Sequence, residues 1–139
     1  MLLSSMLIAA SAAVAGLLGC IHMLYTFHGN KLHPRDPAVR DAMMADTPVL
    51  TRQTTVWRAT KGFNASHSLG VILFAAVYIY LAGWHAGVLQ ASSFLLGLGM
   101  ATLLTYLALA KAYWFSIPFR GIALACVLYA AGLVATALA

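Results

Sequence analysis

The segment Thr47–Ala82 reads TPVLTRQTTVWRATKGFNASHSLGVILFAAVYIYLA. It begins as a charged, amphipathic stretch, becomes polar but uncharged at Asn64–Ser68, and ends in a purely apolar run. Lipid offers no hydrogen-bond partner to Asn, Ser and His side chains, so such groups inside a span mark a protein interior or a functional site. The segment therefore predicts a membrane-spanning helix with a polar entrance, and the candidate site lies there.

The composition of the chain indicates an integral membrane protein. Of its 139 residues, 63% are hydrophobic and 8% are charged, whereas about a quarter of an ordinary soluble domain is charged. A helix needs about 20 apolar residues to cross a bilayer. Four stretches meet that length, at about residues 2–27, 62–84, 88–110 and 119–139. We therefore predict one transmembrane helical domain over residues 1–139, an all-α, four-helix up-and-down bundle.

The charged residues predict the orientation of this bundle. All eight basic residues lie between spans one and two or between spans three and four, counting Arg120 at the very start of span four, whereas the connection between spans two and three carries no charge. Basic loops stay on the cytoplasmic side of a membrane. We therefore expect a multi-pass protein of a bacterial cytoplasmic (inner) membrane, with both charged loops cytoplasmic and both termini outside. Orientation accounts for the net charge of +5, so we expect no nucleic-acid partner.

The connection between spans one and two carries two helix-start signals. Asp36-Pro37 places an N-cap residue before a proline at the first helical position. Thr47-Pro48 repeats the pattern. We therefore predict a cytoplasmic helical extension after Asp36, and either one long helix from Pro48 to about Ala82 or a helix with a kink or break at Gly62.

Polar residues of several spans fall at one depth in the membrane. His22 lies five residues before Phe27, and His67 lies five residues after Gly62. Tyr106 lies five residues before Lys111, and Cys126 lies seven residues after Phe119. At about 1.5 Å per residue, these side chains lie roughly 7–11 Å below the cytoplasmic boundary. Depth fixes height and not rotation, so it leaves open whether the two histidines face each other.

One interpretation of this layer is interhelical hydrogen bonding alone, which is ordinary in membrane bundles. The leading functional interpretation is a non-enzymatic membrane protein whose inner-leaflet pocket binds a lipid-like or quinone-like molecule, or which serves a partner protein. The candidate ligand-binding residues are His22, Tyr25, Trp57, Arg58, Lys61, Asn64, His67, Ser68 and Tyr106.

Three alternatives remain open at this point. A small membrane enzyme would act on a lipid or quinone through His67 and Asn64. Haem or a metal ion would be held by His22 and His67 from facing helices. A transporter would require a homodimer, for which the Ala- and Gly-rich faces of the first and last spans are suited. The residues do not determine a cofactor.

Three runs of the chain carry a family resemblance. They are LHPRDPA at residues 32–38, TRQTTVWRATKGFNASHSLG at 51–70, and YWFSIPFRG at 113–121. Together they resemble an uncharacterised family of small bacterial inner-membrane proteins, with Gly62–Ser68 (GFNASHS) as the most specific element. The resemblance extends over nearly the whole chain and implies four spans in the inner membrane. It implies no activity, cofactor or catalytic residue.

Overall fold

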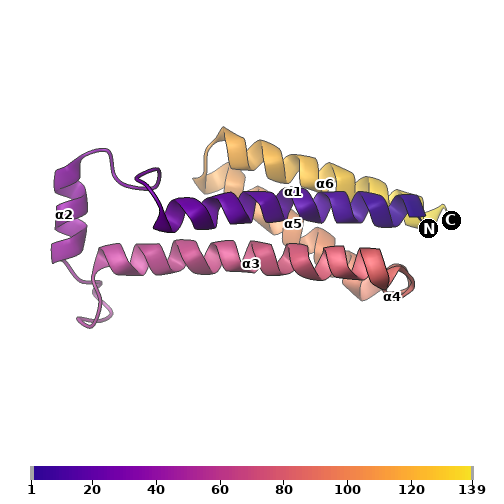
Figure 1. Ribbon diagram of the computed structural model, residues 1–139, viewed down its shortest axis with the longest axis horizontal. Coiled ribbons are helices and arrows are strands. Elements are labelled where there is room, and N and C mark those ends of the chain that lie inside the picture. Colours follow the sequence, from indigo (N-terminus) through magenta and orange to yellow (C-terminus); the bar gives the residue numbers. More distant parts are fainter. Residues whose placement is uncertain (1, 139) are drawn as a thin grey trace. The chain divides into compact units, whose positions relative to one another are not determined.

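The computed structural model describes residues 2–138, and all of its regular structure is helical in that range (Figure 1). The helices are α1 (Leu2–Phe27), α2 (Pro37–Ala45), α3 (Val56–Trp84), α4 (Ala86–Ala91), α5 (Ser93–Tyr113) and α6 (Ser116–Ala137). Four of them, α1, α3, α5 and α6, are long and apolar enough to cross a membrane. The all-α class, the four spans and a helical extension between the first two are thereby confirmed. Ala139, at the end of the predicted fourth span, lies outside the described residues.

The long helices expose many large apolar side chains. Phe63 is 75% exposed, Leu73 is 61% exposed and Val127 is 66% exposed. Soluble proteins rarely leave apolar surface of this extent in contact with water, whereas lipid covers it at no cost. The protein is therefore a multi-pass membrane protein.

Contacts divide the chain into two compact units. The first unit comprises Met1–Leu18 and Val71–Ala139, and the second comprises Gly19–Gly70. Helices α1 and α3 contribute to both units. The prediction of a single domain stays a prediction, and each unit is described by itself below.

In the first unit, serine hydroxyls join α1 to α6. Ser11 Oγ donates to the carbonyl oxygen of Ala125 at 2.6 Å, and Ser4 Oγ donates to that of Gly132 at 3.0 Å. Both serines are buried. From Ser4 to Ser11 the chain runs forward along α1, while the acceptors run backward along α6, so the two helices are antiparallel. Small residues let the backbones approach closely enough for these bonds.

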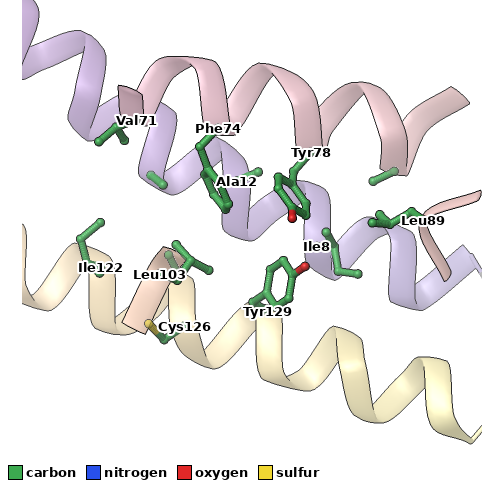
Figure 2. Packing of buried hydrophobic residues seen from close by; sticks show 13 residues of the cluster. Ile8, Ala12, Val71, Phe74, Tyr78, Leu89, Leu103, Ile122, Cys126 and Tyr129 are labelled. Carbon is green, nitrogen blue, oxygen red and sulfur yellow. The ribbon is translucent and has the colours of Figure 1, made fainter. Parts of the chain in front are cut away.

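Two tyrosines form the centre of the core in the same unit (Figure 2). The Tyr78 hydroxyl donates to the Leu95 carbonyl at 2.7 Å, and the Tyr129 hydroxyl donates to the Leu96 carbonyl at 3.1 Å. The two ring centroids lie 5.9 Å apart at 68°, an edge-to-face geometry that aromatic pairs favour. Because Tyr78 lies on α3 and Tyr129 on α6, both helices are tied to α5.

The long α3 helix begins later than the Thr47-Pro48 signal predicts, so the expected start at Pro48 is wrong. Thr51 N–H donates to the Pro48 carbonyl at 3.1 Å, which closes a turn. Thr55 Oγ1 then accepts from the Arg58 N–H at 3.3 Å and serves as the helix cap. The proline thus begins a turn, and a threonine seven residues later begins the helix, which continues through Gly62 without a break.

Helix α2 has the predicted start. Asp36 Oδ1 accepts from the Ala38 N–H at 2.9 Å, and Pro37 occupies the first helical position. The helix has no buried residue. Within the second unit it runs across the axes of the parts of α1 and α3 that belong to that unit (Figure 1).

Replacing Ser11 with alanine tests the α1–α6 contact. The variant loses a hydrogen bond and no packing volume of note, so we expect the free energy of unfolding to fall by about 1 kcal/mol. Ser93→Ala is the matched control, because Ser93 is exposed and surface substitutions change stability by under about 0.5 kcal/mol. Unfolding in mixed detergent micelles measures both. Equal stabilities of the two variants would contradict the role of Ser11.

Candidate functional site

The second unit brings two histidines of different helices together. The ring of His22, on α1, and the ring of His67, on α3, have centroids 5.3 Å apart and an interplanar angle of 81°. The edge of one ring therefore meets the face of the other. The sequence placed the two side chains at one depth, and the structure adds that they face each other.

One ring nitrogen of this histidine pair lacks a hydrogen-bond partner in the described part of the chain. His22 Nε2 is buried and has no hydrogen-bond partner among residues 2–138. The nearby Thr26 hydroxyl donates instead to the His22 backbone carbonyl at 2.8 Å. A buried polar atom without a partner costs about 1–3 kcal/mol. A bound group that donates or accepts at His22 Nε2, according to the ring tautomer, would remove this cost.

A second contact joins α1 and α3 nearer to the loop that follows α1. Lys61 Nζ lies 5.3 Å from the ring centroid of Phe27, within the range of a cation–π interaction. Lys61 and His67 are six residues apart on one helix, which corresponds to about 9 Å along its axis. The α1–α3 pair therefore presents a cation near the loop and two imidazoles about 1.7 turns further along.

On α3, Asn64 lies between Lys61 and His67 in the sequence, and Ser68 directly follows His67. Ser68 is fully buried, and its hydroxyl donates to the Asn64 backbone carbonyl at 2.9 Å. The Ser68 hydrogen is therefore used within the helix. Asn64 is half-buried and supplies its backbone, not its side-chain amide, to this bond.

Trp57 belongs to a separate cluster in the same unit. The His33 ring meets it edge-on at 4.9 Å and 84°, and the Arg40 guanidinium carbon lies 5.8 Å from its centroid. Trp57 therefore packs the 28–55 segment against the start of α3. The neighbouring Arg58 is exposed. No periodic pattern links His33 and Arg40 to Trp57, so sequence reasoning did not find this cluster.

Two further predicted site residues are Tyr25, in the same unit as the histidine pair, and Tyr106, in the other unit. Tyr25 is 39% exposed. Tyr106 belongs to the first unit, where its ring lies 6.5 Å from that of Trp114. The prediction that Tyr106 shares a ligand with the histidines stays a prediction.

As ligands for one metal ion, the two histidines offer one ring nitrogen each. In residues 2–138, no group of three or more His, Cys, Asp or Glu side chains is placed to hold a metal ion. Two imidazoles from facing helices equal the number of axial ligands that a haem iron takes. Ligation by His22 and His67 therefore stays a prediction for haem.

No protein-family model, curated protein or solved structure matches this chain. No activity therefore comes to it through a relative. Among the predicted site residues, the structure brings together His22 and His67, with Lys61 on the same helix as His67.

Proposed function

We propose that the protein is a non-enzymatic membrane protein that binds a lipid-like or quinone-like molecule beside α1 and α3, with its polar head at His22 and His67. The observation that carries the proposal is the buried, unpartnered Nε2 atom of His22, set against the ring of His67. A bundle that used these histidines only to join helices would be expected to satisfy that atom internally.

The chemistry of the surrounding residues favours an amphiphile. Imidazole nitrogens donate to or accept from carbonyl and hydroxyl oxygens of a head group. Lys61 lies toward the loop, where it would meet an anionic part of the same molecule. The hydrocarbon tail of such a molecule would lie in the surrounding lipid.

We propose binding as the primary role, with a small membrane enzyme that acts on a lipid or quinone through His67 and Asn64 as the alternative. We further propose that the α1–α3 connection and the α5–α6 turn face the cytoplasmic side of a bacterial inner membrane, because the eight basic residues lie in or beside these two segments.

Native mass spectrometry of the detergent-purified protein tests the proposal. We expect a discrete added mass on the wild type, reduced at least tenfold in His67→Ala. His85→Ala is the matched control, because His85 is exposed and hydrogen-bonds to Tyr80 at 2.9 Å in the other unit. It should retain the added mass. An added mass equal to that of haem would identify the bis-histidine alternative.

A bare wild-type mass, together with a less stable His67→Ala variant, would overturn the proposal in favour of interhelical contact alone. An added mass that His67→Ala retains in full would overturn the assignment of the site. Thermal unfolding of each variant in the same detergent separates loss of the ligand from loss of the fold.

A further inference from the structure

A surface groove of about 260 Å³ lies at the turn between α5 and α6. It belongs to the first unit. Its lining residues are Ala110, Lys111, Trp114, Phe115, Ser116 and Phe119. One side chain of this set is cationic, three are aromatic and one carries a hydroxyl group, so the groove is amphipathic.

The lengths of the two helices place this groove at the surface of the hydrocarbon core. Helix α5 has 21 residues and α6 has 22 residues, which correspond to roughly 31–33 Å at about 1.5 Å per residue. The hydrocarbon core of a bilayer is about 30 Å thick. The turn between two such helices therefore lies where acyl chains meet lipid headgroups.

The charge of the first unit is concentrated at the same turn. Lys111 and Arg120 are its only Lys, Arg, Asp or Glu residues, so no carboxylate side chain of this unit neutralises them. Lys111 lies in the last turn of α5 and lines the groove, whereas Arg120 is exposed and does not line it. An anion in the groove would therefore meet one uncompensated cation directly.

We propose that this groove binds an anionic phospholipid, with the lipid phosphate against Lys111 and the glycerol and first acyl carbons against the aromatic walls. Trp114 and Phe119 supply those walls, and the exposed Ser116 offers a hydroxyl to a phosphate or ester oxygen. A basic pocket at helix ends recognises lipid headgroups in this way. The proposal does not depend on the histidine pair.

Ordinary anchoring makes a different prediction from the same residues. Lysine side chains snorkel to the membrane surface, and aromatic residues gather there in any lipid. Anchoring of this kind would show little preference for lipid charge at Trp114. It would also predict that Lys111 and Arg120 contribute equally to any preference for anionic lipid, because the two cations lie at the same turn.

Quenching of tryptophan fluorescence by brominated lipids tests the proposal. Trp57→Phe and Trp84→Phe leave Trp114 as the single tryptophan. The protein is reconstituted in phosphatidylcholine bilayers with increasing fractions of brominated phosphatidylglycerol or brominated phosphatidylcholine. We expect half-maximal quenching at about a fivefold lower fraction of the anionic lipid.

Lys111→Gln and Arg120→Gln form the matched pair, because each removes one positive charge at the same turn. Lys111→Gln should abolish the preference for phosphatidylglycerol, whereas Arg120→Gln should retain most of it and Lys111→Arg should restore it. Equal quenching by the two lipids in the unsubstituted background would overturn the proposal. So would an equal loss in the two Gln variants, which would mean general attraction by surface charge.

Discussion

Replacing Tyr129 with alanine is expected to lower the free energy of unfolding by about 3–4 kcal/mol. Tyr129 is fully buried and is among the largest side chains of the core. The substitution removes its ring from Tyr78, 5.9 Å away, and removes the hydrogen bond to the Leu96 carbonyl. Lipid cannot fill the resulting space without opening contacts among α3, α5 and α6.

Two variants divide this loss into its parts. Tyr129→Phe keeps the ring and loses only the hydroxyl, so it should cost about 1 kcal/mol. Val127→Ala, on the lipid-exposed side of the same helix, should be close to neutral. Unfolding by dodecyl sulfate in mixed micelles, followed by circular dichroism, measures all three. An alanine variant no less stable than the phenylalanine variant would contradict the importance of ring packing.

Gly99→Ala is expected to destabilise the protein by about 2 kcal/mol. A Cβ atom at Gly99 would lie 2.6 Å from Tyr129 Cζ and 2.7 Å from Tyr78 Cε1, and would also meet the Tyr129 hydroxyl oxygen. Alanine ordinarily favours a helix over glycine by about 1 kcal/mol, so a loss has to come from this overlap. Gly97→Ala is the matched control, because no heavy atom lies within 4 Å of a Cβ there. It should be neutral or stabilising in the same assay.

The two substitutions should not be additive. Once Tyr129 is alanine, a methyl group at Gly99 enters space that the ring has left. The cost of Gly99→Ala in that background should therefore fall well below its cost in the wild type. Additive costs would contradict direct overlap between Gly99 and Tyr129.

The number and approximate position of the spans could be predicted because lipid imposes a length and a composition that few other folds share. Their ends could not be predicted as well. Residues 88–91 (VLQA) read as the start of the third span, but they belong to the short α4, and Ser92 caps α5 through the Leu95 N–H. Gln90, Ser92 and Ser93 mark that break in the sequence, but hydropathy averaged over the length of a span smooths over three polar residues.

The candidate site was predictable only in part. Counting residues gives depth along a helix, which placed His22 level with His67, but it gives no rotation about the helix axis. Their ring contact therefore required coordinates. The groove beside Lys111 was missed because single residues at a membrane boundary suggest snorkelling and aromatic anchoring, and a concave surface becomes visible only when α5 and α6 are packed.

The bonds from Ser4 and Ser11 to α6 have a consequence for biosynthesis. Their acceptors follow 128 and 114 residues later in the chain. At about 5–20 residues per second of translation, α1 waits roughly 6–25 s for its partner. During that interval the two hydroxyl groups can contact only their own helix, other helices already inserted, lipid or the insertion machinery. The first unit is thus assembled last, and its closure follows the insertion of the final helix.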